Sequence, residues 1–203
     1  MTSRILTLAA AGALSTLALP AFAQATASAT ADLNIRSGAG PAHEVVGMIP
    51  AGQEVEVSGC LEPATWCEVT HDGVTGWASG GYLTAIIDTT PVVIYESADA
   101  AGITTITYDP TLPDGTVTLN GALIAADTTG QGAQVEIDDG AITYLNDNPV
   151  EPIYLDGEVV LGAGLPETVT LTPVPESALA YANINGQAVL VAPETRRVAY
   201  IAR

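Results

Sequence analysis

Lysine is absent from the sequence, and positive charge is rare throughout its 203 residues. Five arginines stand against 23 acidic residues, which gives a formal net charge of −18 at pH 7. A surface so negative repels nucleic acids and anionic membranes, and it favours solubility. We therefore expect no nucleic acid and no membrane surface as a partner. The absence of lysine also excludes a Ser–Lys hydrolase.

Histidine and aromatic residues are also scarce. The only histidines are His43 and His71, and a Ser-His-Asp or Cys-His site would need one of them as its base. His71 precedes an Asp-Gly turn signal, where a solvated turn residue is expected. A hydrolase with two facing carboxylates remains an alternative, but a small chain with few stacking aromatics is poorly suited to a sugar-sized cleft. We expect no enzymatic activity.

Acidic and amide side chains cluster in two short segments, residues 138–140 and 146–148. Their oxygens are of the type that binds calcium, but neither segment has the regular spacing of a calcium loop. Turns are the simpler interpretation. We predict no metal site and no cofactor.

The first residues have the features of a secretory signal peptide. Arg4 supplies the positive charge, residues 5–19 are uncharged and rich in alanine and leucine, and residues 21–23 form an A-x-A motif. Cleavage is expected between Ala23 and Gln24. The apolar run is short for a membrane span, and no later segment approaches spanning length. We expect a soluble protein that is periplasmic or secreted after signal peptide cleavage.

Two cysteines, Cys60 and Cys67, enclose a short loop between strand-like segments. Export would bring them into an oxidising compartment, which favours a disulfide. The chain-entropy model gives about 2–3 kcal/mol of stabilisation for so short a loop. The alternatives are a catalytic thiol, which needs an activating base, and a metal pair, which needs further ligands. We predict the disulfide.

Alternating apolar and polar residues predict short β-strands in the first third of the mature chain. These strands are expected at residues 33–36, 45–49, 54–58 and 66–70. Asp72 and Gly73 then form a strong hairpin signal, because a type I′ turn requires positive φ at both central positions.

Two short motifs bracket these strands. The first is the run Leu-Asn-Ile-Arg-Ser-Gly-Ala-Gly-Pro at residues 33–41. The second combines Gly-Trp-Ala at residues 76–78 with Gly-Tyr-Leu at residues 81–83. Together they resemble the opening and closing signatures of the bacterial SH3 module (SH3b), over residues 30–84. The resemblance implies a small SH3-like barrel that binds a ligand.

The rest of the chain also has an all-β pattern. Asp-Gly and Asn-Gly hairpin signals recur between short alternating runs, and no segment has a convincing helical period. The C-terminal part resembles a domain of unknown function found in exported proteins of alphaproteobacteria, often beside an SH3b module. The segments that carry this resemblance are residues 150–160, 165–169, 185–191 and 193–198. The Pro-x-Thr-Arg-Arg-hydrophobic ending is its most specific part, and the family implies no activity.

The expected fold class is all-β, with an N-terminal SH3-like barrel and a C-terminal β-rich domain of short strands and hairpins. The expected divisions are a signal peptide (1–23), a flexible leader (24–29), the SH3-like domain (30–84), a β-rich linking region or part of the second domain (85–141), and the C-terminal domain of unknown function (142–203).

Four side chains are candidates for ligand binding. Arg36 lies in the opening motif, where by analogy it either pairs with an acid inside the module or contacts ligand. His43 lies in the loop that borders the ligand groove of SH3-like barrels. Trp66, beside Cys67, and Tyr82 offer aromatic faces that suit sugars and peptide side chains.

These features predict an exported, non-catalytic binding protein of the bacterial envelope. The expected partner is a peptidoglycan peptide or glycan, as the SH3b resemblance suggests, or a segment of an envelope protein. The alternative is a structural or protein-interaction factor in which the SH3 module packs on the second domain. In that case Trp66 and Tyr82 would be buried at the domain interface. A small cell-wall hydrolase is the less favoured third alternative.

Overall fold

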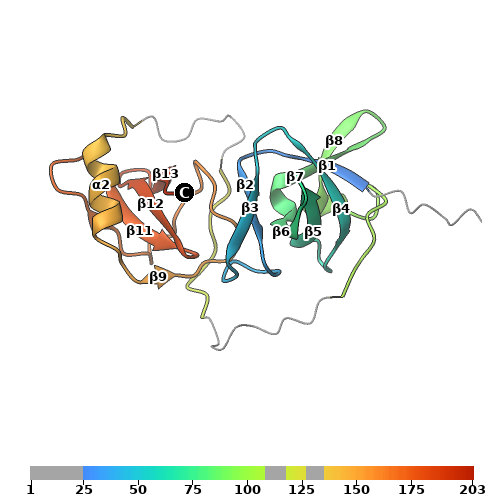
Figure 1. Cartoon of the computed structure of the whole chain (residues 1–203), viewed down its shortest axis with the longest axis horizontal. Helices are drawn as coiled ribbons and strands as arrows, with labels where there is room; N and C mark the ends of the chain where they lie inside the picture. Colours follow the sequence, from blue (N-terminus) through green and yellow to red (C-terminus); the bar gives the residue numbers. More distant parts are fainter. Residues whose placement is uncertain (1–24, 108–117, 127–134) are drawn as a thin grey trace, which may run out of the picture.

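Two β-sheets dominate the computed structural model, which describes residues 25–107, 118–126 and 135–203 (Figure 1). The all-β fold class is confirmed. The expected signal peptide, with its cleavage point between Ala23 and Gln24, lies outside the described residues. No helix in the described part of the chain is long and apolar enough to cross a membrane.

The first sheet has eight strands in the order β3-β2-β6-β5-β4-β1-β7-β8. Together with two short helical turns it forms the N-terminal region, residues 25–107. Its elements are β1 (Ala25–Ala29), β2 (Leu33–Arg36), β3 (Val45–Ile49), β4 (Glu54–Cys60), β5 (Trp66–His71), β6 (Val74–Ser79), η1 (Gly80–Tyr82), β7 (Leu83–Ile87), β8 (Thr90–Val93) and α1 (Ile94–Ser97).

The segment expected as a flexible leader is a strand, and that prediction is wrong. β1 lies between β4 and β7 and pairs antiparallel with both. Its small residues alternate in exposure: Ala27 and Ala29 are buried, while Thr26 is exposed and Ser28 is partly exposed. Backbone pairing with two neighbouring strands orders this segment, so low hydrophobicity was a poor guide to flexibility here.

The first sheet stays open, in contrast to the closed barrel that the resemblance implied. Its edge strands are β3 and β8, which pair only with β2 and β7. β8 contains Pro91, which lacks a backbone N–H and therefore suits an edge. β3 lies beside the C-terminal region instead of pairing with another strand of its own sheet (Figure 1).

A steric requirement explains the glycine of the Gly-Trp motif. β6 pairs with β2 with Trp77 opposite Arg36. A Cβ on Gly76 would lie 2.5 Å from the carbonyl oxygen of Arg36, closer than packed atoms allow. Glycine therefore lets β6 approach β2, where Leu33 and Ile35 fill the core of the first sheet.

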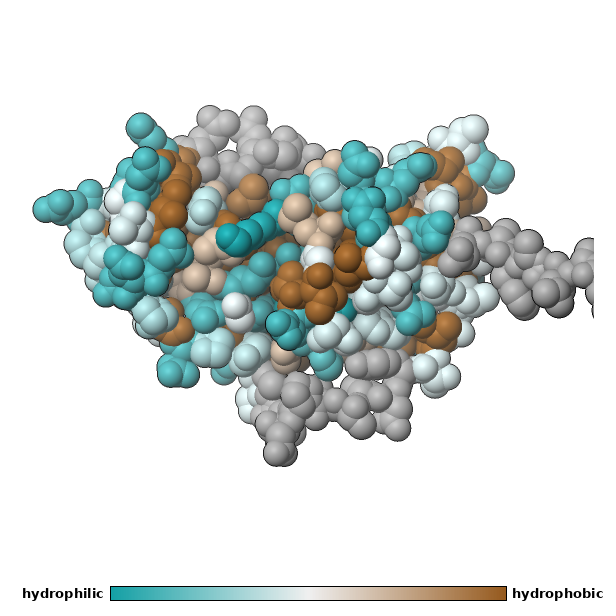
Figure 2. Space-filling model, viewed as in Figure 1, coloured by the Kyte–Doolittle hydropathy of each residue, from teal (hydrophilic) through white to brown (hydrophobic). Residues whose placement is uncertain are grey.

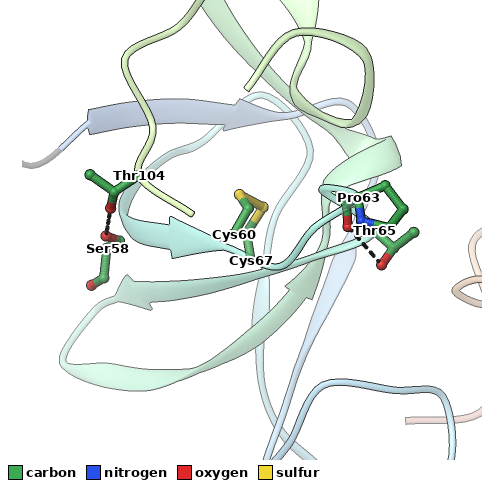
Figure 3. The surroundings of a disulfide bond; sticks show 6 residues. All are labelled: Ser58, Cys60, Pro63, Thr65, Cys67 and Thr104. Atoms are coloured by element: carbon green, nitrogen blue, oxygen red, sulfur yellow. Dashed lines mark hydrogen bonds between the residues drawn. A yellow bond between two sulfur atoms is a disulfide. The ribbon is translucent and has the colours of Figure 1, made fainter. Parts of the chain in front are cut away.

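The predicted disulfide between Cys60 and Cys67 is present and joins facing positions of β4 and β5. Figure 3 shows it beside the segment that leaves the first sheet: the Thr104 hydroxyl donates to the Ser58 carbonyl at 3.2 Å. A Cβ on Gly59 would lie 2.5 Å from a methyl group of the crossing segment. Gly59 leaves room for the departing chain, which is held against β4 by backbone hydrogen bonds of Cys60 with Thr104 and Ile106.

The second sheet belongs to the C-terminal region, residues 118–126 and 135–203. It has five strands, with the order β10-β11-β12-β13 and β9 parallel to β11. The elements are α2 (Asp139–Asp147), β9 (Pro152–Ile153), β10 (Thr172–Pro173), β11 (Ala180–Ile184), β12 (Gln187–Ala192) and β13 (Arg197–Ile201).

The helix α2 corrects the prediction of a turn at residues 138–140. Asp138 is its N-cap, and the side chain accepts a hydrogen bond from the backbone N–H of Ala141 at 2.7 Å. Ala141 and Leu145 then pack into a core that includes Leu190 of β12. The helix lies on the outer side of the second sheet (Figure 1).

The stretch at residues 85–141 is divided between the two regions. β7 and β8 complete the first sheet, and Thr105 bridges to Cys60 of β4. Ala122 and Ile124, in contrast, bridge to Asp156 and Gly164 and so belong to the C-terminal region. The change from one region to the other therefore falls well after residue 84.

Candidate functional site

A cleft of about 940 Å³ lies between β3 and the C-terminal region. Polar side chains from both regions line it, together with small and aliphatic residues. Figure 2 shows hydrophobic surface near the middle of this face, over β3, where the two regions meet.

An ion pair between the two regions lies at the base of the cleft. Arg36 on β2 binds the Glu158 carboxylate through Nε–Oε2 at 2.5 Å and Nη2–Oε1 at 2.6 Å. Both side chains have 0% exposure. Arg36 Nη1 donates in addition to the carbonyl oxygens of Pro41, His43 and Asn185. The guanidinium of Arg36 thus forms its hydrogen bonds with protein groups, as a buried charge requires.

This pairing corrects the analogy that placed an acid partner for Arg36 inside the SH3-like module. Glu158 lies 122 residues further along the chain, in the C-terminal region. The alternation of β2 explains the difference. Leu33 and Ile35 point into the core of the first sheet, so Asn34 and Arg36 project from the opposite face, against the C-terminal region.

Asn34 extends the polar contact between the regions. Its Nδ2 donates to Glu158 Oε1 at 2.9 Å and to Gln187 Oε1 at 3.0 Å. Glu158 Oε1 also accepts from the backbone N–H of Val159 at 2.9 Å. The carboxylate is therefore held by both regions at once.

His43 lines the cleft and is buried. Burial lowers the pKa of its imidazole below the usual value, and the positive charge of Arg36 lowers it further. Both effects favour the neutral imidazole. The backbone carbonyl of His43 accepts from Arg36 at 2.7 Å, which ties this loop to the ion pair.

The structure brings two of the four predicted residues, Arg36 and His43, to the cleft. Trp66 on β5 is 7% exposed and does not line it. Tyr82 is half-buried and packs against core residues of both regions. Burial raises the pKa of its phenol, and the Glu158 carboxylate adds to the rise. A role of these two aromatic side chains in ligand binding stays a prediction.

Sequence reasoning missed Asn34, Glu158 and Gln187. The alternation along the opening motif was the available signal for Asn34, because it places this residue on the face opposite the core. Glu158 is one of 23 acidic residues and has no local feature that distinguishes it. Within the described residues, no group of three or more His, Cys, Asp or Glu side chains could hold a metal ion.

Comparison with known families confirms both resemblances. Residues 31–84 match the bacterial SH3 domain, and residues 144–203 match a domain of unknown function, DUF1236. The chain therefore carries a bacterial SH3 domain followed by a DUF1236 domain. No solved structure matches.

Two curated relatives match a limited part of the chain. One is a probable endopeptidase, p60, of Listeria innocua, 43% identical over 65 residues, which are 32% of this chain and 14% of that protein. The other is a putative N-acetylmuramoyl-L-alanine amidase, YrvJ, of Bacillus subtilis, 35% identical over 54 residues, 27% of this chain and 10% of that protein. The chain thus matches only about a tenth to a seventh of the length of these relatives.

Proposed function

We propose that the chain is a non-catalytic binding protein of the bacterial envelope whose ligand is a part of peptidoglycan. The observation that carries the proposal is the cleft beside β3, which is lined by Arg36 and His43 of the SH3 domain. The name of one of the two relatives, the putative amidase, supports the wall as the partner. The amidase name refers to the bond between muramic acid and alanine, where the glycan of the wall meets its peptide.

The chemistry of the cleft supports binding over catalysis. The Glu158 carboxylate is neutralised by two hydrogen bonds from Arg36. The charge that a general base would use is thereby committed to the protein itself. Both cysteines are joined in the disulfide and offer no thiol nucleophile. The disulfide also supports an extracytoplasmic location, because such bonds persist in oxidising compartments.

A structural or protein-interaction role is the second candidate, and two observations favour it. The outer face of β2 is occupied by Glu158 and Gln187 of the C-terminal region. Tyr82, one of the two aromatic residues that this alternative expected at the domain interface, is half-buried and packs against core residues of both regions. The partner in this case is a segment of an envelope protein.

Co-sedimentation with purified peptidoglycan sacculi across a salt series tests the proposal. The protein is the chain from Gln24 to Arg203, and an unrelated acidic protein of similar size and charge is the control. We expect saturable binding at low salt, where the net charge of this chain, −19 from four arginines and 23 acidic residues, disfavours adhesion to an anionic wall. Absence of binding at every salt concentration would refute wall binding and favour the protein partner.

A further inference from the structure

Two side-chain amides meet on the floor of the cleft, one from each region. Asn34 and Gln187 share one hydrogen bond, and their exposed fractions are 1% and 9%. Among the described residues, the structure gives no hydrogen-bond partner to Asn34 Oδ1 or Gln187 Nε2, and both residues line the cleft. An acceptor and a donor therefore stand side by side in the cleft. This pair is complementary to an extended peptide, because the N–H and C=O of one residue in a strand point to the same side.

The wall formed by β3 suits an extended ligand. β3 is an edge strand, so its outer backbone edge is open to pairing with another chain. Gly47 lines the cleft, and without a side chain it presents its backbone. β3 has five residues, which span about 13 Å at the usual strand rise. That length accommodates about four residues of an extended peptide.

The other lining residues favour small aliphatic groups over sugar rings. Val45 and Met48 line the cleft from β3, and Ala188 and Ala202 line it from the C-terminal region. Tyr154 is the only Trp, Tyr or Phe among the described lining residues. Sugar rings commonly need aromatic faces to cover their apolar side, whereas alanine-sized side chains fit aliphatic walls.

We infer that this cleft binds the peptide part of the wall polymer in an extended form, and that the SH3 and DUF1236 domains form the site together. The N–H of one ligand residue donates to Asn34 Oδ1, and the C=O of the same residue accepts from Gln187 Nε2. The neighbouring ligand residues run beside β3, with small side chains against Met48 and Ala188. This inference rests on the proposed wall binding and adds the ligand class and a role for the C-terminal domain.

A titration followed by nuclear magnetic resonance tests the ligand class. The chain from Gln24 to Arg203, labelled with nitrogen-15, is titrated with N-acetyl-tetraalanine amide and separately with chitotetraose. We expect the peptide to shift the side-chain amide signals of Asn34 and Gln187, and the sugar to leave them in place. Shifts with the sugar alone, or no response of these amides to the peptide, would overturn the inference.

A matched pair of variants tests the position of the site. Met48 and Val46 are both on β3, with exposed fractions of 36% and 43%, but only Met48 lines the cleft. We expect Met48→Glu to weaken peptide binding by at least about fivefold, because a carboxylate replaces an apolar contact. Val46→Glu should stay within about twofold of the unaltered chain. Equal effects of the two variants would contradict the assignment.

Gln187→Ala tests the amide pair itself. Loss of one donor to the ligand should weaken binding about three- to tenfold. A thermal melt by circular dichroism checks that this variant is folded. If it is not folded, the comparison of Met48→Glu with Val46→Glu tests the position of the site instead. Peptide binding unchanged in a folded Gln187→Ala variant would remove the amide pair from the site.

Sacculus binding separates this inference from the proposed function. Release of the bound chain by N-acetyl-tetraalanine amide would support the wall peptide as the occupant. If Met48→Glu sediments with sacculi as well as the unaltered chain does, the wall is bound elsewhere, and the inference fails while the proposed function stands. If the peptide binds but sacculi do not, the proposed function fails and the occupant is a protein segment, which overturns the wall peptide.

Discussion

Removal of the Glu158 carboxylate is the most direct perturbation of the contact between the two regions. In Glu158→Ala, Arg36 keeps its hydrogen bonds to the carbonyls of Pro41, His43 and Asn185 but loses both bonds to the carboxylate. The guanidinium charge then remains at a position with 0% exposure. Breaking one side of a buried pair costs about 3–5 kcal/mol. That is a large share of the total of about 5–15 kcal/mol that stabilises a typical protein.

The double variant Arg36→Met with Glu158→Leu tests the physical reason for this cost. Removing both charges also removes the penalty of keeping them out of water, so apolar replacement of a buried pair is often nearly neutral. Some cost should remain, because Asn34 loses one of its two acceptors. We expect the double variant to exceed Glu158→Ala in unfolding free energy by at least about 2 kcal/mol.

Urea unfolding measures both effects. Trp66 and Trp77 lie in the first sheet, so their fluorescence reports the N-terminal region, whereas far-ultraviolet circular dichroism reports both regions. The two signals should coincide in the unaltered chain and separate in Glu158→Ala, because the polar tie between the regions is lost. A cost below about 1 kcal/mol for Glu158→Ala, or a double variant less stable than the single one, would refute the reasoning.

Three further changes have defined outcomes. Gly76→Ala should lower the free energy of unfolding by about 1–3 kcal/mol, because its methyl group would overlap the Arg36 carbonyl oxygen. The control Gly81→Ala, whose added methyl group would have its nearest atom at 3.8 Å, should change the free energy of unfolding by no more than about 0.5 kcal/mol. Equal losses in urea melts would refute the steric argument. Replacing Cys60 and Cys67 by serine should cost about 2.5 kcal/mol in the same assay, and no loss would show that the disulfide does not restrict the unfolded chain. His43 has a folded-state pKa below its ordinary value of 6.5, so the unfolded chain takes up its proton first as pH falls, and the stability present above that value is lost below it. The decrease in melting temperature between about pH 7.5 and pH 5.5 should be smaller in His43→Gln, and an unchanged pH profile would exclude His43 as its cause.

Local turn chemistry predicted two of the hairpins. Asp72 and Gly73 have φ values of 48° and 81°, as the predicted type I′ turn between β5 and β6 requires. Asn185 and Gly186, at 53° and 80°, form the corresponding turn between β11 and β12. These turns depend on the conformational preferences of two adjacent residues, which the sequence displays directly.

The helix α2 shows where local reading failed. Asp139 and Gly140 have the residue types of a turn, yet they begin a helix because Asp138 caps it. The apolar side of α2 is short, with Ala141 and Leu145 as its buried residues. A nine-residue helix has little stability of its own, so packing against the second sheet decides its formation. That packing involves residues distant in sequence, which a local pattern does not contain.

Only part of the candidate site could be predicted, because some of its residues are distant in sequence. The opening SH3 motif pointed to Arg36, and the loop after it pointed to His43; both line the cleft. Their partners come from the C-terminal region, and an acid such as Glu158 is recognised only once the chain is folded. Trp66 looked like a surface residue because of its neighbours, but its place on β5 buries it.

The ion pair also affects how the chain reaches its folded state. Arg36 and Glu158 are 122 residues apart, so Arg36 emerges during synthesis long before its partner exists. Bringing the ends of a segment of this length together costs about 4 kcal/mol in chain entropy. Until then, the outer face of β2 carries a cation and an amide exposed to water. A gene fragment that stops before residue 158 would lack the partner carboxylate and would keep both groups exposed.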